Sequence, residues 1–147
     1  MKWLMLFVVL TLGFLYASVH RGEASGLQNT EPDCKMDAGS CIKTVDGLTV
    51  SVDITPKPLK AMRNLRFRTT LSNKGKPVTD ASVSITLTMP GMFMGQNVIR
   101  LVHVHEGIYE GNSVIVRCPN GEKIWQASVD IRQSGRETSV NYVFEVQ

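Results

Sequence analysis

From Leu48 onward, hydrophobic and polar residues alternate over short segments that are separated by turn residues. In the first segment Leu48, Val50, Val52 and Ile54 alternate with polar residues, and a period of two predicts a strand with one buried face. About six further segments repeat the pattern, at residues 65–71, 83–89, 97–105, 108–118, 124–131 and 140–146. Proline, glycine and asparagine separate most of these segments, as expected for turns between strands.

No segment shows a convincing helical period, and no helix is expected between consecutive strands. About seven short antiparallel strands without βαβ alternation predict an all-β immunoglobulin-like sandwich. The cysteine-tryptophan-cysteine pattern of antibody domains is missing from the chain. We therefore expect the sandwich architecture without the antibody-type core.

A hydrophobic segment precedes the predicted strands. Lys2 is followed by an apolar run of 17 residues, Trp3 to Val19, and this order of charge and apolar core is typical of a secretory signal. The run is also just long enough to span a bilayer, which requires about 17 to 25 residues. Residues 1–25 are therefore predicted to be a signal peptide or a membrane anchor, with cleavage after Ala24 as one outcome. Either outcome places the rest of the chain outside the cytoplasm, for example in the periplasm.

Residues 26–45 are polar and are expected to form a tether, and residues 46–147 the domain. The tether contains Cys34 and Cys41, and an oxidising compartment would allow these neighbours to form a disulfide. Closing so short a loop stabilises a fold by about 2.5 kcal/mol. Cys118 is then left over, although its pairing with either of the other two cysteines stays open at this stage.

The formal net charge of +3 is small, and its scattered distribution does not favour nucleic acid as a partner. A local basic cluster comprises Lys57, Lys60, Arg63, Arg66 and Arg68. It is typical of a solvated surface, and contact with anionic lipid or an acidic partner is the alternative. The chain has neither a Ser, His and Asp set nor a zinc motif or phosphate loop at suggestive spacing. We therefore expect a protein that is not an enzyme.

The candidate metal ligands are Met89, Met92, Met94, His103, His105 and Cys118. Thioethers and thiolates are soft ligands that select Cu(I), so this set predicts a copper site rather than a zinc, calcium or magnesium site. In a strand, residues two apart share a face, which would place the two histidines together. The alternatives are that the methionines pack in the core or over the open end of the sandwich, that the histidines face solvent, and that the cysteine is a buried thiol.

Several short motifs in the second half of the chain resemble those of the YtkA-like domain family, which is related to the FixH proteins. They are a Met-Pro-x-Met turn, a Gly-x-Tyr-x-Gly step and a late glycine and tryptophan: here Met89, Pro90 and Met92; Gly107, Tyr109 and Gly111; Gly121 and Trp125. The resemblance implies an immunoglobulin-like sandwich outside the cytoplasm, often membrane-tethered, without catalytic activity and sometimes near copper handling or oxidase assembly. Phe93 and Asn120 depart from the family pattern, which often has a histidine and a methionine-proline-glycine sequence in these regions.

Two functions follow as hypotheses. The first is an exported domain that binds Cu(I) or another soft metal. The second is an interaction or assembly module of a membrane complex, such as an oxidase or efflux complex, in which the methionine-rich edge is an adhesive apolar patch without metal. A purely structural exported domain is the remaining alternative.

Overall fold

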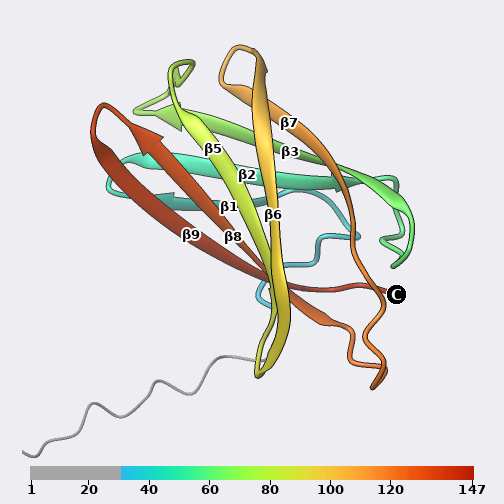
Figure 1. Ribbon diagram of the computed structural model, residues 1–147. Coiled ribbons are helices and arrows are strands. Elements are labelled where there is room, and N and C mark those ends of the chain that lie inside the picture. Colours follow the sequence, from blue (N-terminus) through green and yellow to red (C-terminus); the bar gives the residue numbers. More distant parts are fainter. Residues whose placement is uncertain (1–30) are drawn as a thin grey trace, which may run out of the picture.

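The computed structural model describes residues 31–147 (Figure 1). The predicted signal peptide or anchor, residues 1–25, and the first residues of the tether lie outside the described part. Within that part the strands are β1 (Cys41–Val45), β2 (Leu48–Thr55), β3 (Asn64–Asn73), β4 (Lys76–Pro77), β5 (Ser82–Met89), β6 (Met92–His105), β7 (Ile108–Val114), β8 (Ile124–Gln133) and β9 (Arg136–Glu145). The same residues include no helix with the length and hydrophobicity needed to cross a membrane.

The strands form two antiparallel layers that are joined by β6. The order of hydrogen-bonded neighbours is β1-β2-β3-β7-β6-β5-β8-β9, and the short β4 pairs with β3. β6 pairs with β5 up to Leu101 and with β7 from Val102 onward. The predicted all-β sandwich is confirmed.

The core lies between the layers and is built from the inward positions of the alternating segments. Every second residue from Leu48 to Ile54 and from Val83 to Met89 is buried. The largest fully buried or nearly fully buried side chains are Trp125, Tyr109, Tyr142, Phe67 and Phe144. The inward faces expected from the sequence are therefore confirmed for these strands.

β1 and β4 were not predicted from the hydrophobic pattern. Residues 41–45 belong to the segment expected as a tether, yet they pair along their whole length with β2. Their side chains alternate between half-buried and exposed, so their sequence carries no clear apolar face. β4 is only two residues long, which is too short for a period to be visible.

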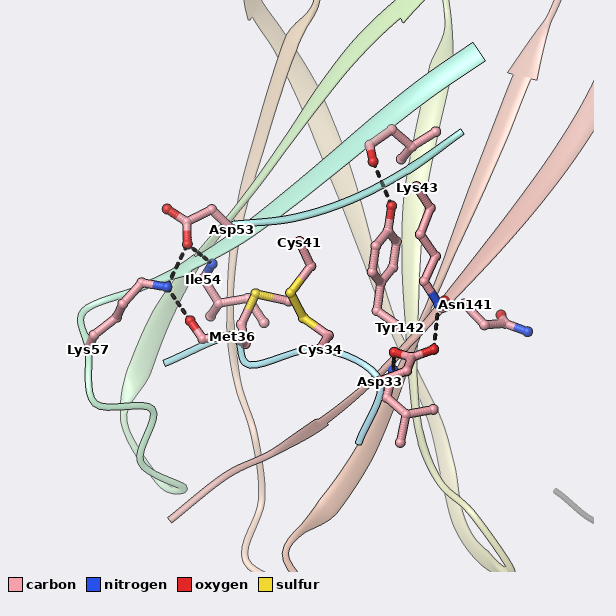
Figure 2. Close-up of a disulfide and its surroundings, with 12 residues drawn as sticks. Asp33, Cys34, Met36, Cys41, Lys43, Asp53, Ile54, Lys57, Asn141 and Tyr142 are labelled. Atoms are coloured by element: carbon pink, nitrogen blue, oxygen red, sulfur yellow. Dashed lines mark hydrogen bonds and ion pairs between the residues drawn. A yellow bond between two sulfur atoms is a disulfide. The ribbon is translucent and has the colours of Figure 1, made fainter. Parts of the chain in front are cut away.

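A clip at the N-terminus of the described chain joins the two outer strands, β1 and β9 (Figure 2). The expected disulfide between Cys34 and Cys41 is confirmed. The N–H groups of Asp33 and Cys34 both donate to the carbonyl of Val143, at 3.0 and 3.1 Å. The Val143 N–H in turn donates to the Asp33 carboxylate at 2.9 Å. These bonds occupy part of the free backbone edge of β9, a kind of edge that otherwise pairs with other chains.

Lys43 adds a second connection between the same two strands. Its ammonium group donates to the Asn141 carbonyl at 2.6 Å and pairs with the Asp33 carboxylate. It also lies 5.1 Å from the centre of the Tyr142 ring, within the range of a cation–π interaction. The Lys43 side chain of β1 thus contacts the backbone and an aromatic ring of β9, and also Asp33, which is itself hydrogen-bonded to β9.

The Gly-x-Tyr-x-Gly step fixes the turn from β6 into β7. Gly107 has φ +76°, and a Cβ placed there would lie 2.4 Å from the carbonyl oxygen of Leu71. The Leu71 N–H donates to the Gly107 carbonyl at 2.8 Å. The Tyr109 hydroxyl donates to the Val78 carbonyl at 3.0 Å and accepts from the Ala81 N–H at 3.1 Å. The turn is therefore held against β3 and against the connection from β4 to β5.

Gly111 allows β6 to approach β7 closely where β6 changes layers. A Cβ at Gly111 would lie 2.8 Å from Leu101 Cδ2 and 3.1 Å from the Arg100 carbonyl oxygen. Leu101 is the last residue that pairs with β5. The glycine at position 111 therefore leaves room for the backbone of β6 at the place where the two layers join.

We predict that Gly107→Ala destabilises the fold far more than Gly135→Ala. Both glycines have φ +76°, but a Cβ at Gly135 meets no atom within 4 Å. Backbone strain alone costs about 1–2 kcal/mol, whereas the contact with the Leu71 carbonyl should raise the loss at Gly107 to about 3 kcal/mol or more. Urea unfolding of both variants measures the difference, and equal losses would contradict the close packing of this turn.

Tyr142 links the two layers through the core. Its side chain is fully buried, and its hydroxyl, on β9, donates to the Val50 carbonyl of β2 at 2.7 Å (Figure 2). Burial, which disfavours the charged phenolate, and to a lesser extent the nearby Asp33 carboxylate raise the pKa of Tyr142 to about 12. The phenol is therefore held in its neutral form in the folded protein.

This raised pKa predicts a loss of stability at alkaline pH. Since the pKa is about 10 in the unfolded chain and about 12 in the folded one, the contribution of Tyr142 is complete below pH 10 and declines as pH rises toward 12. The wild type should lose about 1.5 kcal/mol more than Tyr142→Phe between pH 10 and 11.5. Urea unfolding over this range tests the prediction, and parallel losses in the two proteins would contradict it.

Candidate functional site

The β5–β6 hairpin brings two methionines together at one end of the sandwich. β5 ends at Met89, Gly91 takes φ +77° in the turn, and Met92 begins β6. Met89 and Met92 are paired across the hairpin, and paired residues of antiparallel strands place their side chains on the same face. Met89 is 4% exposed, and the half-buried Met92 packs against the core.

Cys118 reaches the same place from the connection between β7 and β8. The N–H of Gly121 donates to the Cys118 carbonyl at 3.1 Å, so residues 118–121 form a tight turn. The Cys118 thiol is free, 3% exposed, and lies 3.7 Å from the Met92 sulfur. Two sulfurs bound to one ion at about 2.3 Å would lie about 3.7–4.0 Å apart. The observed separation fits this requirement.

Two hollows flank the sulfur pair, each of about 220 Å³. One is lined by Met89, Pro90, Gly91, Met92, Glu122 and Ile124. The other includes Cys118, Trp125 and again Glu122 in its lining. A small ion therefore has an approach to the sulfurs from two sides, and the single carboxylate that borders both approaches is that of Glu122.

The structure does not bring the histidines to the sulfurs. His103 and His105 are exposed near the far end of β6, where they pair with Tyr109 and Ile108. Eleven residues of strand separate Met92 from His103, which corresponds to about 36 Å. The His103 ring instead lies 5.1 Å from the Tyr109 ring. An ion bound at Met92 is out of reach of both imidazoles.

Met94 is a β6 residue whose side chain lies outside the described part of the structure. Among the side chains that are described, no group of three or more His, Cys, Asp or Glu residues is arranged to hold a metal ion. Of the predicted donors, the fold brings the sulfurs of Met92 and Cys118 into contact and pairs Met89 with Met92 across the hairpin.

Two apolar side chains at the same end of the sandwich are exposed. Phe93, the second residue of β6, is 89% exposed, and Met62 in the β2–β3 loop is 65% exposed. Neither side chain was identified as a surface feature from the sequence. Met62 belongs to a loop, where alternation does not define an inward face. Phe93 follows Met92, which packs against the core, so the alternation of β6 places Phe93 outward.

Comparison with known proteins identifies the family and the fold of the chain. Residues 42–121 match the model of the YtkA-like family, and no curated protein matches the chain. A DUF4785 family protein from Legionella pneumophila is similar in structure, with a TM-score of 0.53 and 15% identity over 70% of this chain and 29% of that chain. This chain thus corresponds to less than a third of that protein, and the likeness concerns the fold alone.

A more distant likeness is found to the GAE domain of GGA2p from Saccharomyces cerevisiae, with a TM-score of 0.35 and 13% identity over 74% of this chain and 98% of that chain. The family assignment does not depend on it. The family model covers more than half of the chain, and it includes the methionine turn and the Gly-x-Tyr-x-Gly step whose packing is described above. This protein belongs to the YtkA-like family.

Proposed function

We propose that this protein is a non-catalytic, exported domain that binds a soft metal ion, Cu(I), through Met92 and Cys118, with Met89 as a third ligand. The observation that carries the proposal is the 3.7 Å separation of the Cys118 and Met92 sulfurs. The Met92 and Cys118 sulfurs come from separate segments of the chain and lie in contact, and Met89 is paired with Met92 across the hairpin. Soft sulfur ligands favour Cu(I) over hard cations.

The surroundings of the sulfurs also support a metal site. Cys118 is buried and has no cysteine partner, so its thiol is protected from pairing with other chains. Metal binding requires the thiolate and therefore releases a proton. The fixed turn at residues 118–121 and the hairpin at Met89 and Met92 hold the donors in place before the ion arrives. Such preorganisation lowers the entropic cost of binding.

The Cys34–Cys41 disulfide supports a location outside the cytoplasm, where disulfides persist. The apolar segment at residues 3–19 supports the same location. Outside the cytoplasm, the protein does not have to compete with cytosolic thiols for Cu(I). Export and soft-metal binding are thus mutually consistent parts of one proposal.

We predict that the protein binds about one equivalent of Cu(I) in competition with a chromogenic Cu(I) chelator. The reductant should be ascorbate, and mass spectrometry should verify that the disulfide stays closed, since freed Cys34 and Cys41 would add thiol ligands. Met92→Leu should weaken binding by about tenfold or more, and Cys118→Ala should weaken it further because the thiolate is lost.

Matched controls come from the same chain. Met62→Leu removes an exposed thioether outside the sulfur site, and His103→Ala removes an imidazole about 36 Å from Met92. Both variants should bind Cu(I) as the wild type does. The proposal is wrong if the wild type retains no Cu(I), or if Cys118→Ala binds it unchanged.

A metal-free interaction module is the second candidate function, and the exposure of Phe93 favours it. A phenylalanine that is 89% exposed contributes nothing to the core, whereas a partner surface could bury it. The two candidates use neighbouring but separate groups, because the sulfurs of Met89 and Cys118 are buried and Phe93 is not.

A further inference from the structure

One end of the sandwich, here called the basic end, combines exposed apolar tips with cations. It consists of the β2–β3 loop, the β5–β6 turn and the β7–β8 connection (Figure 1). Its apolar side chains are Met62, Phe93 and Val116, and its cations are Lys60, Arg63, Arg66, Arg117 and Lys123.

Backbone hydrogen bonds join these segments into one surface. The N–H of Met62 donates to the Ile115 carbonyl, and that of Ala61 donates to the Gln147 carbonyl, both at 2.8 Å. The Val146 N–H donates to the Lys123 carbonyl at 2.9 Å. The Cys118 and Met92 contact connects the β5–β6 turn to the same surface. The backbone segments that carry these side chains are therefore fixed relative to one another by the fold.

The cations of the basic end form no ion pair within residues 31–147. Of the basic cluster noted in the sequence, Lys57 pairs with Asp53 and Arg68 with Glu110. No described acidic side chain pairs with any of the five cations of the basic end. Glu122 and Glu145 lie on neighbouring segments, and the Asp37 carboxylate accepts from the Leu59 N–H. The five cations outnumber these three carboxylates.

The exposed apolar side chains of the basic end do not form a continuous patch. Protein interfaces usually have a continuous apolar centre that is poor in lysine. Phe93, Met62 and Val116 instead come from three separate segments of the chain, with cations between them in the sequence. Isolated apolar tips among lysine and arginine suit a surface that offers both hydrocarbon and phosphate, as a bilayer interface does.

The position at which the chain enters the domain also favours a membrane. Asp33 binds Val143 near the C-terminal end of β9, which is the strand end that leads to Gln147 and the basic end. Thirteen residues separate Asp33 from Val19, the last residue of the apolar run, and they span at most about 50 Å. A domain anchored by that run would stay close to the bilayer with the basic end available to it.

We propose that the basic end docks on the surface of an anionic bilayer, with Phe93 and Met62 inserted between headgroups and the five cations near lipid phosphates. The inference takes its extracytoplasmic, membrane-anchored setting from the proposed function, and it does not require bound copper. Its consequence is that the sulfur site faces the membrane rather than the bulk solvent.

The test uses the full chain, residues 1–147, in nanodiscs that contain a spin-labelled lipid. With phosphatidylglycerol in the disc, amide signals of Met62, Phe93 and Arg117 should be broadened, and those of Gly47 and Gly135 at the opposite end should not. Phosphatidylcholine discs should give much weaker broadening. Absence of broadening, broadening at the opposite end, or equal broadening with both lipids would overturn the proposal, and the first is expected if an acidic protein is the true partner.

Substitutions test the contributions of the cations and of Phe93 separately. Arg63→Gln and Arg117→Gln should each lower the ratio of docked to free domain about fivefold, and Phe93→Asp should abolish docking. Arg136→Gln removes an exposed cation at the opposite end and should change nothing. Unperturbed amide spectra of the core strands show that each variant is folded. Cu(I) binding by Phe93→Asp should equal that of the wild type, so a failure of docking and a failure of the copper proposal are distinguishable.

Discussion

β6 pairs first with β5 and then with β7, and this change of partner joins the two layers of the sandwich. It requires the backbone of β6 near Leu101 to approach Gly111 more closely than a side chain would allow. The same long strand carries Met92 at its start and His103 near its end. Its course therefore decides both how the layers connect and which of the candidate ligands meet.

The outer strands of the structure face each other across a gap that the N-terminal clip closes. Asp33 and Cys34 occupy backbone groups of β9, and Lys43 of β1 reaches the same strand. The disulfide keeps the segment that carries Asp33 attached to β1. Tyr142 then connects β9 to β2 through the interior. The contacts that cover the edge of β9 thus also connect β9 to β1, and Tyr142 connects it to β2.

Much of the fold could be predicted because half-buried strands have a period of two. The inward residues from Leu48 to Ile54 and from Val83 to Met89 follow that period, and they are buried as expected. β1 lacks a clear apolar face, and the end of β6 is exposed on both faces. The alternation of apolar and polar residues therefore predicted neither the strand at residues 41–45 nor the orientation of the His103 side chain.

The sequence indicated which residue types could form the candidate site, but it did not show which of those residues lie close together in the fold. Two cysteines separated by six residues close a short loop at low entropic cost, so the Cys34–Cys41 pair was the one favoured by the sequence. The proximity of Cys118 to Met92 depends on how the β7–β8 connection folds across the β5–β6 turn, and no local pattern encodes such a long-range contact. The separation of the histidines from the methionines follows from the unbroken length of β6.

The account rests on the claim that Met92 and Cys118 hold a soft metal ion. X-ray absorption at the copper edge, on protein loaded with one equivalent of Cu(I), tests that claim most directly. The account predicts a first shell of sulfur at about 2.3 Å without imidazole nitrogen, a shell that changes in Cys118→Ala. A first shell of nitrogen or oxygen, or a spectrum that is identical in the Cys118 variant, would contradict it.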